Sequence, residues 1–145
     1  MSTPLDLIST IEFARKIHGH VGPFLVIGLR MGIAAKKVLD ISDSEQAHLR
    51  AQVTVPLNPP FSCLLDGVQV STTCTIGNQR LEFENVKTIQ ATFQSEKTMK
   101  KVKIKIKQQF WEQLEQKHVQ NRLDEAFAWE IARMPESHLF EITNE

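Results

Sequence analysis

In the N-terminal part of the chain, apolar residues recur every three or four positions, which is the spacing of one face of an α-helix. One such pattern runs from about residue 3 to Gly19, and a second runs from Pro23 to Leu39. Gly28 and Gly32 lie four residues apart in the second helix, although a glycine inside a helix costs about 1 kcal/mol relative to alanine. Their shared face therefore predicts close packing against another backbone, either within the chain or across a dimer.

The centre of the chain alternates apolar and polar residues, as strands do when one face is buried. Strands are predicted at 50–56, 81–84, 88–94 and 101–107. In the last of these, lysines alternate with Val102, Ile104 and Ile106. We interpret the lysines as a solvated open face of the sheet rather than as a site for an acidic partner.

Further helices are expected on both sides of these central strands. Ser62 can begin a helix that ends before Gly77, although this segment would also tolerate a strand. Helical spacing returns at 109–118 and 123–133. N-terminal helices, a central and mostly antiparallel sheet, and C-terminal helices together predict one α+β domain over residues 1–145.

The composition, with 41% hydrophobic and 23% charged residues, is typical of a globular domain. Because 17 basic residues balance 17 acidic ones, we expect neither nucleic acid nor a membrane surface as a partner. No apolar run is long enough to cross a bilayer, and the N-terminus lacks the pattern of a signal peptide. Two cysteines do not form a disulfide framework. We therefore expect a cytoplasmic protein.

Four residues could supply metal ligands. His18 and His20 flank Gly19 at the break between the first two helices, and Cys63 and Cys74 lie 11 residues apart. Imidazole and thiolate are preferred ligands of zinc. A continuous helix would place both cysteines on one face, so the two segments together predict three or four ligands. Three protein ligands would leave an open coordination position.

The spacing alone leaves other interpretations open. The cysteines could be buried and inert, with a histidine pair that only ends helices. The cysteines could also be a redox-active pair. Four more side chains could either orient metal ligands or act as turn and cap residues, namely Asn58, Asp66, Gln69 and Asn78.

At these motifs the chain resembles the FmdE family, which is named after a component of formylmethanofuran dehydrogenase. The family's first motif reads roughly His-Gly-His-x-Cys-Pro-Gly, and residues 18–24 read HGHVGPF. Its second motif, Ser-Cys-x-x-Asp-Ala-Ile-Gln followed by Gly-Cys-Thr-x-Gly, is similar to SCLLDGVQ at 62–69 and TCTIG at 73–77. The closing segment 136–142, ESHLFEI, also looks like the family's core domain.

The resemblance implies an α+β core domain, often dimeric, with metal ligation by His20, Cys63 and Cys74 and with His18 as ligand or support. The chain departs from the pattern at Gly22, where the family has a cysteine, which argues against a three-thiolate site or an iron–sulfur cluster. No cysteines remain for the C-terminal zinc module of many relatives.

The leading hypothesis is therefore a protein that binds a divalent metal ion, with Zn²⁺ as the first candidate. It would either assist a molybdenum or tungsten oxidoreductase of the formylmethanofuran dehydrogenase type or bind a small molecule at an open metal position. One alternative is a zinc-dependent hydrolytic enzyme with Asp66 or His18 as the base. The other is a thiol redox sensor that uses Cys63 and Cys74.

Overall fold

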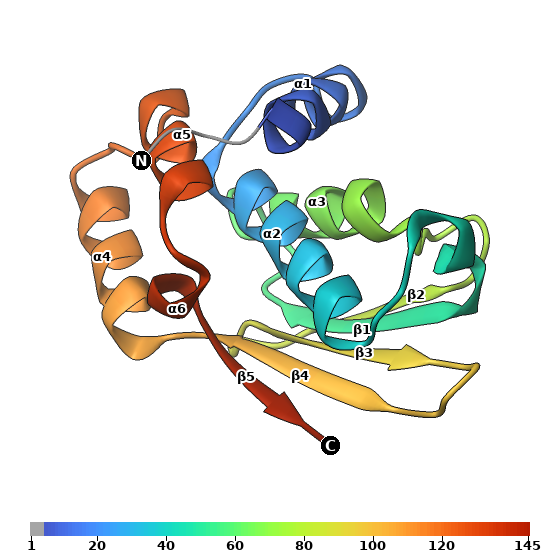
Figure 1. Cartoon of the computed structure of the whole chain (residues 1–145). Coiled ribbons are helices and arrows are strands. Elements are labelled where there is room, and N and C mark those ends of the chain that lie inside the picture. The colour runs from blue at the N-terminus through green and yellow to red at the C-terminus, as the bar shows by residue number, and fades with distance from the viewer. Residues whose placement is uncertain (1–4) are drawn as a thin grey trace.

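The computed structural model describes residues 5–145 and consists of helices packed on one face of a five-stranded sheet (Figure 1). The predicted start of the first helix, at residue 3, lies outside the described residues. In chain order the elements are α1 (Leu5–His18), α2 (Pro23–Val38), the 3-10 helix η1 (Asp43–His48), β1 (Leu49–Val55), α3 (Cys63–Thr72), β2 (Leu81–Asn85), β3 (Gln90–Ser95), β4 (Lys101–Ile106), α4 (Gln108–Val119), α5 (Glu125–Arg133), α6 (Glu136–Leu139) and β5 (Phe140–Asn144).

The strands lie in the order β2-β1-β3-β4-β5. β1 and β2 are parallel, with α3 as the crossover between them, and every other neighbouring pair is antiparallel. The α+β class and the mostly antiparallel sheet are therefore confirmed. β5 was not among the predicted strands. It follows the C-terminal helices and pairs with β4, where Ile142 lies beside Ile104.

The core lies between the sheet and α2, which carries eleven buried residues. On the sheet side, Val53 and Val55 of β1 and Val102 and Ile104 of β4 are buried, whereas Ile106 at the end of β4 is only partly buried. α2 is covered by the sheet, by α3 and by α5 (Figure 1), so its side chains are apolar around nearly the whole helix. Within residues 5–145, no helix is long and apolar enough to span a membrane.

Two glycines allow the backbones of α2 and α3 to touch. A Cβ atom on Gly28 would lie 2.1 Å from the carbonyl oxygen of Leu64, and one on Gly67 would lie 2.1 Å from that of Leu25. The prediction of close backbone packing is confirmed at Gly28, whereas the close neighbours of Gly32 are the side chains of Ser71 and Thr72, and all of these neighbours belong to a helix of the same chain. The glycine face of α2 therefore gives no support to a dimer.

Arg30 joins α2 to the C-terminal end of α5. Its guanidinium donates hydrogen bonds to the carbonyl oxygens of Ile131 and Met134. The carbonyl of Ile131 also accepts the amide of Met134 at 3.2 Å, so the arginine adds a charged donor to the carbonyls at this helix end, where intrahelical partners run out. Burial lowers the pKa of Arg30.

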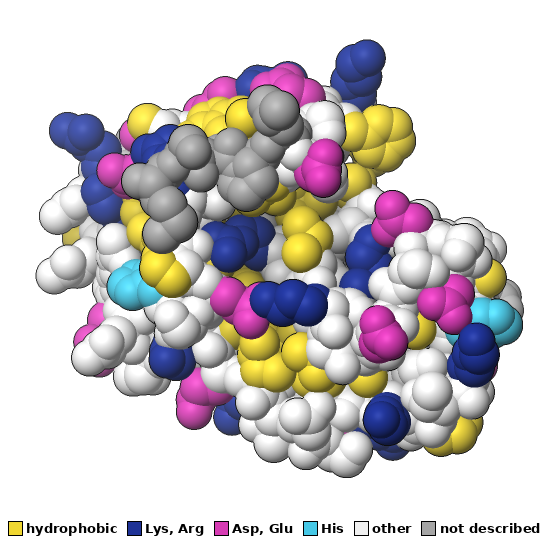
Figure 2. All heavy atoms as spheres, in the orientation of Figure 1, with side chains coloured by type: hydrophobic (Ala, Val, Ile, Leu, Met, Phe, Trp, Pro, Cys, Tyr) yellow, Lys and Arg dark blue, Asp and Glu magenta, His cyan; other side chains and the backbone are white. Residues whose placement is uncertain are grey.

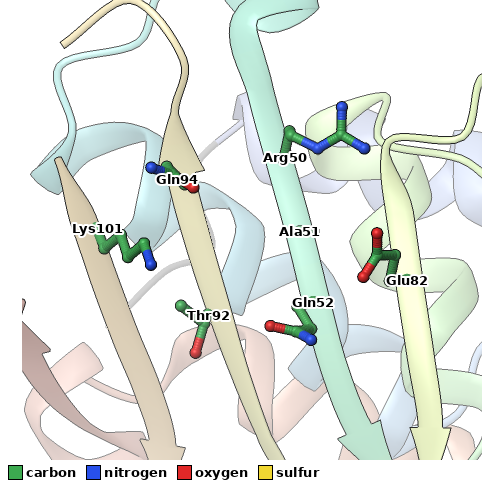
Figure 3. A pocket seen from close by; sticks show the side chains of 7 residues that line it. All are labelled: Arg50, Ala51, Gln52, Glu82, Thr92, Gln94 and Lys101. Carbon is green, nitrogen blue, oxygen red and sulfur yellow. The ribbon is translucent and has the colours of Figure 1, made fainter. Parts of the chain in front are cut away.

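The face of the molecule seen in Figure 2 is mixed in charge. Basic and acidic side chains are interspersed over the face seen in Figure 2 and do not gather into one patch of a single sign. The uncovered face of the sheet carries polar side chains of β1, β2, β3 and β4 around a shallow hollow of about 200 Å³, including Gln52, Glu82 and Lys101 (Figure 3). This hollow shares no lining residue with the predicted metal site.

Candidate metal and ligand site

The HGHVGPF segment forms a corner between α1 and α2. Gly19 has a positive φ of 101°, which glycine adopts readily, and its amide donates to the carbonyl oxygen of Arg15 at 2.7 Å. The chain then turns into α2, which begins at Pro23 with the proline in the first helical position. The corner therefore places His18 at the end of one helix and His20 just before the next.

His18 is fixed by Asp66, which lies in the first turn of α3. Its Nδ1 atom lies 2.6 Å from Oδ2 of Asp66, and Oδ1 of that carboxylate accepts a hydrogen bond from Gln69 at 3.2 Å. An ionised carboxylate only accepts hydrogen bonds, so Nδ1 is the donor, and in the tautomer with its proton on Nδ1 alone the Nε2 atom carries a free lone pair. Nε2 is buried and has no hydrogen-bond partner in the part of the chain that the structure describes.

His20 lies beside His18, with 4.6 Å between the centres of the two rings. It is exposed, so its side chain has room to rotate. A Cβ atom on Gly22 would lie 3.7 Å from Nε2 of His20. The side chain of a cysteine at position 22 would therefore project beside His20, which places the family's missing thiol at this same corner.

Cys63 is the first residue of α3 and shares a hollow with His20 and Gly22. The hollow has a volume of about 290 Å³ and also reaches Glu125 at the start of α5. Cys63 is partly buried, and burial raises the pKa of its thiol, with the nearby carboxylate of Asp66 adding to the shift. Without a cation nearby the thiol stays protonated at neutral pH, so it is not an activated nucleophile.

Cys74 does not join this group, which corrects the prediction that both cysteines bind one ion. α3 ends at Thr72, because Thr73 takes a left-handed conformation with φ of 58°. Ten helical residues span about 15 Å, so the two cysteines lie at opposite ends of α3. The Cys74 thiol is buried and donates to the carbonyl oxygen of Leu49 at 3.2 Å.

The same separation excludes a disulfide between the cysteines in the folded chain, since the Cα atoms of a disulfide lie no more than about 7 Å apart. Burial raises the pKa of Cys74 as well as that of Cys63. The geometry therefore contradicts the thiol redox pair.

Among the other predicted residues, Asp66 contacts a histidine directly and Gln69 contacts Asp66. Gln69 also accepts a hydrogen bond from the amide of Ile76 at 3.2 Å. Asn78 instead organises the loop after α3, where its side chain accepts from the amides of Thr75 and Arg80. Asn58 is exposed and bonds to the carbonyl oxygen of Pro59. Both asparagines act as turn residues.

Sequence reasoning missed an ion pair next to the hollow. Arg15 of α1 donates to both carboxylate oxygens of Glu125, at 3.1 and 2.7 Å, and Trp129 donates to the same carboxylate at 3.1 Å. The pKa of Glu125 is lowered to about 2, mainly by its hydrogen bonds with Arg15 and to a smaller extent by the nearby His20. The pair joins residues 110 positions apart, so no local sequence pattern marks it.

The side chains at this corner are of the types that bind metal ions, but they do not lie close enough together to hold one. The buried unpartnered Nε2 of His18, the carboxylate behind it, and a histidine and a cysteine that line one hollow are a donor set typical of zinc. In the part of the chain that the structure describes, however, no three His, Cys, Asp or Glu side chains stand close enough to hold an ion. Ligation would require a side chain to move, and His20 is the exposed one.

Comparison with known proteins identifies the class of this α+β domain. The sequence matches the family described as "FmdE, Molybdenum formylmethanofuran dehydrogenase operon" over residues 17–141, so the chain belongs to the FmdE family. A crystal structure of a tungsten formylmethanofuran dehydrogenase FmdE-like protein from Syntrophus aciditrophicus superposes with a TM-score of 0.70. That match covers 96% of this chain and 71% of the other at 20% identity, and it supports the fold alone.

A relative from Archaeoglobus fulgidus is described as a probable S-adenosyl-L-methionine-binding protein. It is 37% identical over 68 residues, which are 47% of this chain and 18% of the relative. The chain thus matches less than a fifth of that protein's length.

Proposed function

We propose that this protein binds a divalent metal ion, with Zn²⁺ as the first candidate, through His18, His20 and Cys63. The observation that carries the proposal is the buried Nε2 of His18, which has no hydrogen-bond partner among residues 5–145. An unsatisfied buried polar atom costs about 1–3 kcal/mol. A metal ion would satisfy it, and the Asp66 carboxylate on the other ring nitrogen is the support that metal-binding histidines usually have.

In this proposal His18 is held in place and His20 is the ligand that moves. Asp66 fixes the first ring through a 2.6 Å contact, whereas His20 is exposed. Cys63 becomes a ligand as its thiolate, because an adjacent cation would offset the burial that raises its pKa. Cys74 is not included, because it lies at the far end of α3.

Three protein ligands leave one coordination position free, and a zinc ion there can polarise or hold a small molecule. Both carboxylate oxygens of Asp66 are already hydrogen-bonded, and His18 is used as a ligand, so neither predicted residue remains as a general base. These contacts favour a binding or accessory role over hydrolysis. The names of the family, of the Syntrophus protein and of the Archaeoglobus relative suggest two partners to test, a molybdenum or tungsten oxidoreductase and S-adenosyl-L-methionine.

Metal analysis of protein purified without a histidine tag tests the proposal. After incubation with zinc and removal of free metal, the wild-type chain should retain one zinc ion. His20→Ala and Cys63→Ala should retain much less, whereas the matched controls His48→Ala and Cys74→Ala should retain the wild-type amount. His48 is an exposed histidine outside the corner, and Cys74 is the cysteine that the structure places elsewhere. Equal retention in all four variants would show that the site is wrong.

A further inference from the structure

An apolar hollow adjoins the polar hollow of the proposed metal site. It has a volume of about 130 Å³, and Phe24 and Leu123 line both hollows. Phe61 stands between three other rings, with ring centres 5.2 Å from Phe24, 6.3 Å from Trp111 and 5.9 Å from His118. The polar corner therefore continues into a pocket with aromatic walls.

The size of this apolar hollow indicates what it can hold. A protein cavity of about 150 Å³ lined by apolar side chains accepts benzene. A hollow of about 130 Å³ is accordingly suited to one ring-sized apolar group. Together the two hollows fall in the lower part of the range of about 300–1,000 Å³ found for small-molecule pockets.

The two hollows differ in chemistry in a way that suggests a two-part ligand. His20, Cys63 and Glu125 border the polar hollow, whereas the lining of the other is mainly aromatic and aliphatic. Val119 lines the apolar hollow and is 86% exposed, so apolar surface faces water there. A ring placed in this hollow would remove that surface from water, which is favourable.

We propose that the ligand of this protein is a small organic molecule with a metal-binding head and one aromatic or similarly sized apolar group. The apolar group lies against Phe61 and Trp111, and the head faces His20 and Cys63. This inference rests on the proposed metal-binding function and adds the class of molecule that the site selects.

Phenylalkyl hydroxamates with different numbers of methylenes between ring and head are suitable probes, because they combine a metal-chelating group with a phenyl ring. Acetohydroxamate has the head without the ring, and 3-phenylpropanol has the ring without the chelating head. With zinc-loaded protein, calorimetry should show at least one phenylalkyl hydroxamate binding about ten-fold more tightly than acetohydroxamate, or better.

Val119→Arg tests the location of the ring. The side chain is 86% exposed, so the substitution leaves the core intact while it places a long charged group at the apolar hollow. It should remove the advantage of the phenyl probes and leave the affinity for acetohydroxamate unchanged. Ile76→Arg is the matched control, since Ile76 is an exposed apolar residue that lines neither hollow. This control should behave as wild type. Trp111→Ala should act like Val119→Arg if it folds.

The outcomes separate this inference from the function on which it rests. If zinc binds but no phenyl probe exceeds acetohydroxamate, the apolar subsite is wrong and the metal site stands. If no zinc binds, 3-phenylpropanol still tests the apolar hollow through the fluorescence of Trp111 in a Trp129→Phe background. A response that Val119→Arg abolishes would support the subsite, and no response would overturn it.

Discussion

The contact between α2 and α3 predicts that Gly28→Ala destabilises the protein strongly. The added Cβ would lie 2.1 Å from the carbonyl oxygen of Leu64 and 3.1 Å from the Cα atom of Gly67. Both obstacles are backbone atoms, so relief requires the helices to move apart. Alanine would contribute about 1 kcal/mol of helix propensity. Overpacking in a core costs about 1–3 kcal/mol and occasionally more, and a backbone clash belongs at the upper end.

We therefore expect a net loss of about 2 kcal/mol or more in the free energy of unfolding. For a chain of this length, that corresponds to a decrease in Tm of roughly 4–8 °C. Urea and thermal denaturation followed by circular dichroism measure both quantities. Gly22→Ala is the control, because its Cβ would meet nothing closer than 3.7 Å and its backbone is extended, so its stability should match wild type. If Gly28→Ala were as stable as wild type, the close α2–α3 packing would be wrong.

Three further substitutions test separate parts of the account. Arg30→Met should lower the unfolding free energy by about 2 kcal/mol, because two carbonyls lose a charged donor. It should also speed amide exchange at the end of α5, and unchanged exchange would contradict this capping role. Gly22→Cys should fold normally and bind zinc about ten-fold more tightly or better, whereas Gly22→Ser should not; equal affinities would show that position 22 lies outside the site. Arg15→Gln should raise the pKa of Glu125 from about 2 toward its ordinary value, as read by carbon NMR. In the wild type this ion pair contributes stability above about pH 4.5 that is lost as the pH falls toward 2, so the variant should lose that dependence; an unmoved pKa would refute the pairing.

The alternation and helical spacing were enough to predict most elements, because most of the elements have one buried and one exposed face. α2 and the strand with alternating lysines were predicted almost to the residue. β5 was missed because its five residues follow a four-residue helix and pair with a strand about forty positions earlier. Pairing at that distance leaves no local signal.

The site was predicted only in part for a similar reason. In the folded chain His18 contacts Asp66, and His20 and Cys63 line one hollow, whereas metal binding by these residues stays a prediction. Helical spacing placed Cys74 wrongly, because residues on one face of a helix can still lie three turns apart along its axis. The ion pair of Arg15 with Glu125 could not be predicted, since it joins the first and fifth helices only after the chain has folded.

The central claim is that His18, His20 and Cys63 hold one metal ion. A crystal structure of zinc-loaded protein, with anomalous scattering measured on both sides of the zinc edge, tests it most directly. We predict one strong peak at the corner between α1 and α2, bonded to Nε2 of His18, to the ring of His20 and to Sγ of Cys63. A crystal with no zinc at this corner, or with zinc bound at Cys74, would contradict it.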